Sequence, residues 1–379
     1  MAAAQLSCSS TGGLMFRAGW NRKYLASLTA VTFLGTLVLP TTGPQEQDAG
    51  LSDVAILSLL RDHGVTTEPS LFDGEQPAQT VRPSLGDDQV ATLTEEPIDA
   101  SVSEDLLEEI VYTSEVSIPN MSAGTIEVLS DQGGDFRFSM PDAGTAHREE
   151  LTAGIDAFRH DPNVVSVTVT QTNGVQVVTL ITDESAPTTY SYDLELDGGE
   201  AVSVDSGAIL VFDAAGALVG GFEPAWAYDS AGNSVPTRYE LDGSTLTQVV
   251  EHDANTMYPV IADPKYTSGV LDKSDVSSYS SKNPGYKVSA WLSGNGRWLL
   301  GLDAIAFSTL GWNILKKHHP GYVLRGGKDA PTMKQQWDCH VLGGMLEWGS
   351  FDLETGRKSL PNWITRVGTV WPASKVCNW

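Results

Sequence analysis

The residues with the clearest chemical potential are a cysteine and a histidine side by side, Cys339 and His340, in the stretch QQWDCHVLGG. A cysteine thiolate is activated when a histidine takes its proton, so the pair could be a nucleophile with its base. Adjacent side chains, however, point to opposite faces of a strand and diverge by about 100° on a helix. Catalytic cysteine and histidine residues usually meet through the fold instead. Adjacency alone therefore does not indicate a dyad.

The cysteine count favours a structural role for Cys339. The chain has three cysteines, and Cys8 lies in a leader that we expect to be removed, or ahead of a later start at Met15. Cys339 and Cys377 remain, and an even pair in an exported protein is interpreted first as a disulfide. The bridge would close a long loop, worth about 4 kcal/mol in the loop-entropy model. We therefore predict a Cys339–Cys377 disulfide.

Three other observations bear on catalysis. His340, Glu354 and Arg357 form the candidate catalytic set, and Glu354 and Arg357 also have the i, i+3 spacing of a simple ion pair. A glycosidase would need two carboxylates facing one cleft, which spacing cannot establish. The histidines lack a metal-ligand spacing such as H-E-x-x-H, so we expect no metal and no cofactor. His318 and His319 follow two lysines, which suits the C-terminal end of a helix.

Tryptophans are concentrated near the C-terminus, with eight of the ten between residues 286 and 379. Large aromatic side chains build the cores of small domains, so most of the eight should be buried. Exposed ones would form a stacking platform for sugars or a belt at a membrane interface. The candidates for such ligand binding are Trp337, Trp348 and Trp363.

The N-terminal segment, residues 1–43, is typical of a signal peptide or an N-terminal anchor. Arg17, Arg22 and Lys23 precede the uncharged run 24–39. Sixteen residues suit the apolar part of a signal peptide better than a membrane span of about 20 residues. No A-x-A cleavage site follows, so an uncleaved anchor stays open. We expect the protein to be secreted, or held on the outer face of the plasma membrane through residues 24–39 only.

Charge divides the rest of the chain. The net charge of −25 comprises +3 in residues 1–43, −34 in residues 44–280 and +6 in residues 281–379. The acidic section repels polyanions, so we expect no nucleic acid to bind residues 44–280. The basic section could approach an anionic surface such as a cell-wall polymer or the envelope.

Composition then predicts the domains. Residues 44–110 contain five prolines and many acids, and predict an acidic, largely disordered linker with one short helix at 52–61, capped by Ser52 and stopped by Gly64. Residues 111–265 predict a β-rich domain, because short β-branched runs alternate with Asp/Gly turns. Those turns are at 131–134, 213–216, 229–232 and 242–243.

Local patterns refine the β-rich domain. Residues 165–170 alternate apolar and hydroxyl side chains, which predicts a half-buried strand, and Asn173-Gly174 predicts a type I′ turn into a partner strand. One helix is expected around 146–160. The acidic turn residues lack the spacing of a calcium loop, so turn chemistry is the stronger interpretation.

The remaining segments are a Ser-rich flexible linker at 266–285 and a Trp-rich C-terminal domain at 286–379. In the latter we expect a hairpin around 293–296 and a helix near 308–317 that ends at Pro320-Gly321. The predicted fold class is a mainly β middle domain, a sandwich or open barrel, followed by a small α+β domain with a disulfide.

Two stretches resemble known families. Residues 205–265, with PAWA, VPTRY, LTQ and YPVIADP, resemble a module of secreted actinobacterial proteins that precedes a variable C-terminal domain. Residues 286–379, with PTM, QQ, CH, FDLE, Arg357 and the closing CN, resemble the bacterial domain of unknown function 2599. Lys358 and Trp379 stand where that family tends to have proline. The resemblance implies an exported, disulfide-bearing domain with no assigned reaction.

These patterns lead to two functional hypotheses. The first is a secreted or envelope-associated protein whose C-terminal domain binds the cell envelope or a carbohydrate, on a β-rich scaffold. The alternative is a secreted hydrolase or toxin effector carried by the same domain, using His340 and a carboxylate such as Glu354. Whether the protein is an enzyme is left open by the sequence.

Overall fold

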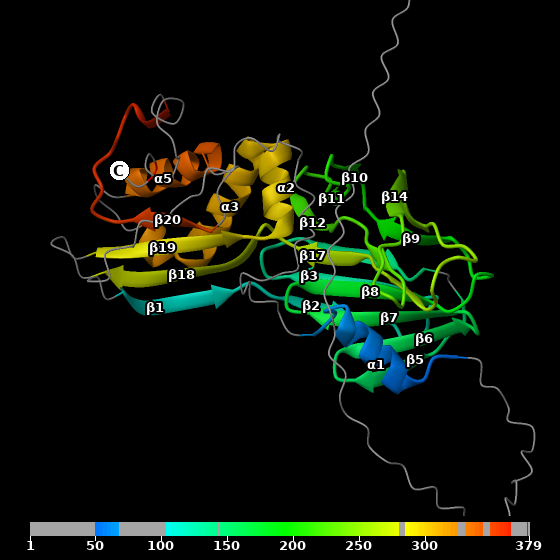
Figure 1. Cartoon of the computed structure of the whole chain (residues 1–379). Coiled ribbons are helices and arrows are strands. Elements are labelled where there is room, and N and C mark those ends of the chain that lie inside the picture. The colour runs from blue at the N-terminus through cyan, green and yellow to red at the C-terminus, as the bar shows by residue number, and fades with distance from the viewer. Residues whose placement is uncertain are drawn as a thin grey trace, which may run out of the picture. The chain divides into compact units, whose positions relative to one another are not determined.

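The computed structural model describes residues 50–67, 104–141, 144–279, 285–324, 330–343 and 349–364, together with Cys377 (Figure 1). These residues form three antiparallel sheets and five helices. The predicted leader 1–43 and residues 44–49 and 68–103 of the predicted linker lie outside the described residues. The last part of the predicted linker, residues 104–110, differs from its prediction because it belongs to a paired strand.

Helix α1 (Asp53–Asp62) forms where the sequence predicts it. The Ser52 hydroxyl accepts a hydrogen bond from the Ala55 amide at 3.3 Å, as an N-cap does, and Gly64 adopts a φ of 70° after the last turn. Ile56 and Leu60 are buried and pack in a cluster that includes Val165. The short helix is therefore anchored by an apolar face, which an isolated helix of this length would lack.

Two sheets build the β-rich domain. The larger has the order β10-β11-β12-β17-β8-β7-β6-β5, with β13 and β16 beside β8, and the smaller has the order β14-β15-β9-β4-β3-β2. The larger sheet contains β5 (Arg148–Thr152), β6 (Ile155–Asp161), β7 (Val164–Gln171), β8 (Gly174–Ile181), β10 (Glu200–Ser203), β11 (Ile209–Phe212), β12 (Leu218–Phe222), β13 (Ala227–Tyr228), β16 (Val260–Ala262) and β17 (Lys265–Ser268). The smaller contains β2 (Ser114–Ser117), β3 (Thr125–Ser130), β4 (Asp135–Ser139), β9 (Thr189–Glu195), β14 (Thr237–Asp242) and β15 (Thr245–Val250).

The core between these sheets is aromatic. Phe136 and Phe138 of the smaller sheet pack against Phe222 and Tyr266 of the larger, with ring centroids 4.9 to 6.3 Å apart. Two sheets that share one core in this way form a sandwich. The predicted mainly β middle domain is therefore confirmed.

The β7 strand differs from its prediction because both of its faces are buried, not one. Val165, Val167 and Val169 pack on the side of α1, whereas Val164 packs in the core between the sheets. The alternating hydroxyl residues Ser166 and Thr168 are buried as well. Alternation predicted the strand correctly, but the covering helix lies far away in the sequence.

Two local predictions in this domain are wrong. Residues 146–160 form the hairpin of β5 and β6, not a helix, and Gly154 turns it with a φ of 77°. Gln171 pairs with Gly174, so the two turn residues of the β7–β8 hairpin are Thr172 and Asn173 instead of Asn173 and Gly174. Neither has a positive φ, so the turn is not the predicted type I′. A Cβ at Gly174 would lie 2.1 Å from the Tyr266 carbonyl oxygen. That glycine therefore permits the close approach of β17.

The Asp/Gly turns are confirmed as turns. Asp213 Oδ1 accepts the amides of Ala215 and Ala217, at 2.9 and 2.8 Å. Asp229 Oδ1 makes the same pair of contacts two and four residues on, both at 2.9 Å. The carboxylates satisfy their own turns, as expected for Asp at such positions.

The third sheet has the order β1-β18-β19-β20 and belongs to the C-terminal domain. Its strands are β1 (Glu104–Val111), β18 (Leu271–Tyr279), β19 (Gly285–Leu292) and β20 (Ser350–Glu354). The prediction of a flexible linker at 266–285 is therefore wrong over 266–279, which form β17 and β18, whereas 280–284 lie outside the described residues. Serines of β18 are buried within the sheet, so a Ser-rich composition did not mean solvation here.

Four helices cover one face of this sheet (Figure 1). They are α2 (Gly294–Leu302), α3 (Ala304–His318), α4 (Pro320–Val323) and α5 (Ala330–Gly343). The helix predicted at 308–317 is confirmed within α3. The hairpin predicted at 293–296 is wrong, because Ser293 caps α2 through a hydrogen bond from the Gly296 amide at 3.1 Å. The small α+β C-terminal domain is confirmed.

Candidate functional site

Helix α5 carries both residues of the Cys-His step. Cys339 is bonded to Cys377, with their Cα atoms 5.4 Å apart, and both side chains are fully buried. Trp363 packs against the pair. The predicted disulfide is confirmed, so Cys339 has no thiolate with which to attack a substrate.

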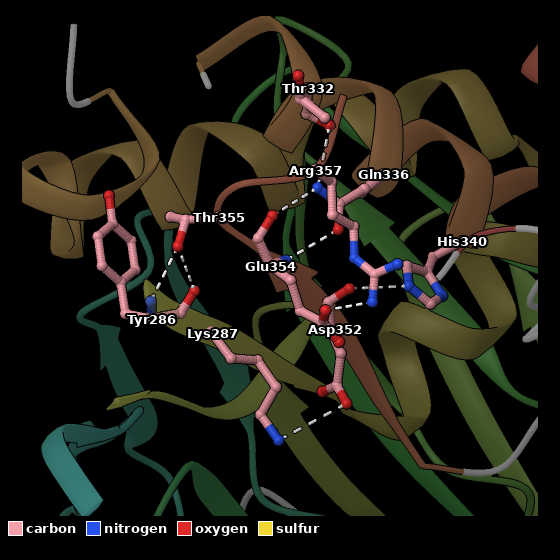
Figure 2. Close-up of polar contacts among 9 residues, drawn as sticks. All are labelled: Tyr286, Lys287, Thr332, Gln336, His340, Asp352, Glu354, Thr355 and Arg357. Atoms are coloured by element: carbon pink, nitrogen blue, oxygen red, sulfur yellow. Dashed lines mark hydrogen bonds and ion pairs between the residues drawn. The ribbon is translucent and has the colours of Figure 1, made fainter. Parts of the chain in front are cut away.

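His340 holds the edge of the sheet. Its Nε2 lies 3.0 Å from the Asp352 carbonyl oxygen and therefore donates to it, and its ring stacks on Phe351 with centroids 5.1 Å apart. One turn earlier, Gln336 donates to the Glu354 carbonyl at 2.9 Å and accepts from the Glu354 amide at 2.8 Å (Figure 2). An i, i+4 pair on α5 thus meets an i, i+2 pair on β20.

These contacts have a clear structural purpose. Strand β20 is an edge strand, and its outer N–H and C=O groups would otherwise be buried under α5 without partners. Gln336 is fully buried and His340 is 5% exposed. The imidazole of His340 therefore has a structural role as a hydrogen-bond donor to the backbone of β20. Its exposed fraction is too small for a general base that contacts a substrate.

Glu354 and Arg357 form the ion pair that their spacing suggested. The pair spans the turn after β20, where Gly356 has a φ of 77°. Side-chain exposures are 27% and 16% respectively. The three candidate residues are thus gathered around the end of β20, as Figure 2 shows, but each has a structural contact there.

The tryptophan candidates are divided between the core and the part of the chain that the structure leaves undescribed. Trp337 is fully buried, donates through Nε1 to the Ser308 carbonyl at 3.0 Å and stacks on Phe307. Trp363 is 9% exposed, and Trp348 lies outside the described residues. Neither Trp337 nor Trp363 offers a ring face to solvent, so both belong to the core.

The face of the C-terminal sheet that no described helix covers is a better candidate for binding, although its serines Ser277 and Ser289 are buried between larger neighbours. We call it the open face, and its residues are Glu109 and Val111 of β1, Lys273, Asp275 and Ser277 of β18, Lys287, Ser289 and Trp291 of β19, and Ser350, Asp352 and Glu354 of β20. They alternate along the strands with the residues that pack under the helices. Trp291 is half-buried here, and sequence reasoning did not single it out.

The open face is ordered in rows across the strands. Glu109, Asp275, Ser289 and Asp352 are direct cross-strand neighbours and form an acidic row. On either side lie basic residues: Lys273 contacts Glu109 at 3.2 Å, and Lys287 lies 3.8 Å from Asp352.

At the centre of this face, Lys273 contacts an aromatic ring and Asp275 has a shifted pKa. The Lys273 ammonium lies 4.3 Å from the centre of the Trp291 ring. Burial raises the pKa of Asp275, and the carboxylates of Asp352 and Glu109 add to the rise against the opposing effect of the two lysines. The pKa of Asp275 is therefore raised by its burial, since the two lysines lower it more than the two carboxylates raise it.

The sequence predicted His319 only as part of a helix end, whereas the structure also gives it buried polar contacts. His319 caps α3 and is 1% exposed; its Nε2 lies 2.7 Å from the Ser274 hydroxyl, and its Nδ1 lies 3.5 Å from Glu108 Oε1. The order Ser, His, acid is that of a hydrolase triad. Ser274, however, is fully buried and also bonded to the Tyr112 hydroxyl at 2.7 Å, so a substrate has no access to it.

The signal for this group is not local. Ser274 and His319 are 45 residues apart, and Tyr112 lies 162 residues before Ser274. Within the described residues, no three His, Cys, Asp or Glu side chains are grouped so as to hold a metal ion. No helix in that same part of the chain is long and apolar enough to cross a membrane.

Comparison of the whole chain with protein-family models, with curated proteins and with solved structures finds no match.

Proposed function

We propose that this chain is an exported, envelope-associated binding protein, and that the open face of its C-terminal domain holds a cell-wall polymer or another carbohydrate. The observation that carries the proposal is the open face itself, which places Trp291 beside a row of carboxylates on a rigid sheet. Sites built on strands hold their side chains more precisely than sites on loops.

The chemistry of the open face suits a sugar. The Trp291 ring is half-buried, with the Lys273 ammonium 4.3 Å from its centre, so a sugar would bind to the part of the ring that Lys273 leaves exposed. Ionised carboxylates accept hydrogen bonds from hydroxyl groups. Lys273 and Lys287 supply donors on either side. Alternating donors and acceptors around one aromatic ring match a ligand that carries hydroxyls on an apolar ring.

The acidic row supports a binding role for a further reason. Glu109 and Asp275 are direct cross-strand neighbours, and like charges in that position destabilise a sheet. Residues that cost stability yet occupy an ordered surface are expected at functional sites. A ligand that donates hydrogen bonds to both carboxylates would relieve their repulsion.

Export is supported by the sequence and is consistent with the disulfide. The uncharged run 24–39 after three basic residues fits a leader or an anchor. A disulfide persists in an oxidising compartment. The resemblance of residues 286–379 to the domain of unknown function 2599 is part of the same proposal.

The alternative, a secreted hydrolase or toxin effector, is less well supported. It needs His340 as an accessible acid or base, whereas the His340 ring is buried and donates to a carbonyl. Growth arrest of a host that exports the protein, lost in the variant Glu354→Gln, would favour this alternative over binding.

Retention on insoluble purified cell wall at low salt tests the proposal. The mature chain should be retained, and Trp291→Ala should weaken retention about tenfold, since one well-placed aromatic contact is worth about 1 to 2 kcal/mol. Trp226→Ala, in the β-rich domain, is the matched control and should bind like the wild type. Failure of the wild type to bind, or equal loss in both variants, would contradict the proposal.

A further inference from the structure

A chain of four polar groups connects β1 with the end of α3 beneath the helices. The Tyr112 hydroxyl, just after β1, lies 2.7 Å from the Ser274 hydroxyl of β18, which lies 2.7 Å from Nε2 of His319. His319 Nδ1 faces Glu108 of β1 at 3.5 Å. Tyr112, Ser274 and His319 are all at most 1% exposed.

Only one arrangement of protons gives both hydroxyl donors, those of Tyr112 and Ser274, an acceptor within this group. Tyr112 donates to Ser274 and Ser274 donates to Nε2 of His319. The ring hydrogen is then on Nδ1, which lies 3.5 Å from Glu108 Oε1, near that carboxylate but without a hydrogen bond. The imidazole must then be neutral, because Nε2 accepts. A buried donor without an acceptor costs about 1 to 3 kcal/mol, so this order is strongly favoured.

Protonation of His319 reverses the donor and acceptor roles in both hydrogen bonds of this group. Nε2 then donates to the Ser274 oxygen, Ser274 must turn its hydrogen to the Tyr112 oxygen, and the Tyr112 hydrogen must find another acceptor. Beyond Ser274, the described residues offer the Tyr112 hydroxyl no second hydrogen-bond partner. The buried chain therefore accommodates the neutral ring but not the charged one.

The surrounding charges leave this preference in place. Burial lowers the pKa of His319 and His318 lowers it further, whereas Glu108 opposes the shift. The other titratable groups are Tyr112 after β1, Asp131 at the β3–β4 turn and Lys317 beside His318 on α3. A folded-state pKa below the usual 6.5 means that stability is complete above pH 6.5 and is lost as pH falls toward the lowered value.

The hydrogen-bonded group of Tyr112, Ser274 and His319 connects strand β1 to the rest of the C-terminal domain. Strand β1 is an edge strand, paired on one side only, with β18. Glu108 and Ile110 face the helices, and Glu109 contributes to the open face. Local opening at an edge requires less free energy than global unfolding.

We propose that His319 is an acid-sensitive latch, which fastens β1 to the C-terminal domain while it is neutral and releases β1 when it takes up a proton. Release of β1 removes Glu109 from the acidic row, so acid also weakens the open face as a binding surface. The latch rests on the contacts of His319 alone, whereas its effect on ligand binding rests on the proposed function.

Hydrogen exchange of the β1 amides in the full mature chain tests the latch. Protection factors, corrected for intrinsic exchange, should fall about tenfold between pH 7.5 and pH 5.0, because one proton is taken up on opening. His319→Gln keeps an amide that can donate and accept but does not titrate, so its β1 protection should be unchanged over this range. His147→Gln, an exposed histidine, should behave like the wild type.

A second variant keeps the test decisive if His319→Gln does not fold. Glu108→Gln removes the carboxylate that favours the imidazolium, so the loss of β1 protection should continue to lower pH than in the wild type. Parallel curves for the wild type and His319→Gln, or identical curves for the wild type and Glu108→Gln, would overturn the latch.

Binding to insoluble cell wall, measured on the same samples at pH 7.5 and 5.0, separates the latch from the proposed function. Binding that weakens together with β1 protection supports the regulatory role. Absence of binding at pH 7.5 overturns the proposed function. The hydrogen-exchange results alone then decide whether the latch exists.

Discussion

The two faces of the C-terminal sheet use similar residue types for opposite purposes. Beneath the helices, His340, Gln336 and His319 are buried, and each is matched to a backbone or hydroxyl partner. On the open face, Glu109 and Asp275 are cross-strand neighbours of the same charge, and Lys273 contacts Glu109. The helix-covered face is held by buried hydrogen bonds, although Nδ1 of His319 has no hydrogen-bond partner among the described residues. The charges of the open face instead meet in partly exposed ion pairs.

This difference shows where a partner is to be expected. A polar group that has its hydrogen bonds within the fold gains little from a ligand, because a bond must break before another forms. A charged row at a partly wet surface can gain from a ligand without such a loss. The Cys-His step that first suggested chemistry lies on helix α5, and Trp291 lies on the open face.

The largest expected effect concerns the disulfide that joins α5 to Cys377. Replacing both cysteines, Cys339→Ser with Cys377→Ser, should lower the free energy of unfolding by about 4 kcal/mol, since the bridge closes a loop of 38 residues. Urea denaturation of the oxidised protein and the double variant measures it. An unchanged midpoint would mean that the packing around Trp363 suffices without the bridge.

A smaller loss is expected where α5 meets the edge strand. His340→Ala removes the donor to the Asp352 carbonyl and the ring stacked on Phe351, and should cost about 2 kcal/mol of unfolding free energy. Cell-wall binding per folded molecule should stay the same. If stability changes by less than 0.5 kcal/mol (about the effect of an ordinary surface substitution) while binding disappears, His340 contacts the ligand and the contrast between the faces fails.

The smallest effect has the opposite sign and belongs to the open face. Asp275→Asn should raise the free energy of unfolding at neutral pH by about 0.5 kcal/mol, because it removes a like-charge neighbour of Glu109. The same variant should weaken cell-wall binding.

The pH dependence of this gain follows from the raised pKa of Asp275. A carboxyl whose folded-state pKa is raised costs stability only when it is ionised, so the cost is absent below the ordinary pKa of 3.8. Denaturation midpoints of the wild type and Asp275→Asn should therefore converge as pH falls toward 3.8. A constant difference at every pH would point to packing instead of charge.

Several elements could be predicted from local patterns because local forces decide them. Ser52 and Gly64 delimit α1 through a cap and a positive φ, and Asp213 and Asp229 satisfy their own turns. The disulfide followed from counting cysteines and from the expectation of export. In each case the decisive partner lies nearby or is the only residue of its kind.

Other elements could not be predicted because their partners are remote. The serines of β18 suggested a solvated linker, but β1 and β19 pair with that strand on its two sides. Gly174 suggested a turn, but its role is set by the Tyr266 carbonyl pressed against it. Composition describes a segment alone, whereas burial depends on what covers it.

For the functional residues, the sequence by itself determined the inventory: two cysteines besides Cys8, a concentration of tryptophans and a basic C-terminal section. Only the tertiary structure decided that Trp337 is core and that Trp291 lies on the open face. It also joined Tyr112, Ser274 and His319 into one chain of hydrogen bonds. The reason is that alternation along a strand gives two faces, and only the helices packed on one of them determine which face meets solvent.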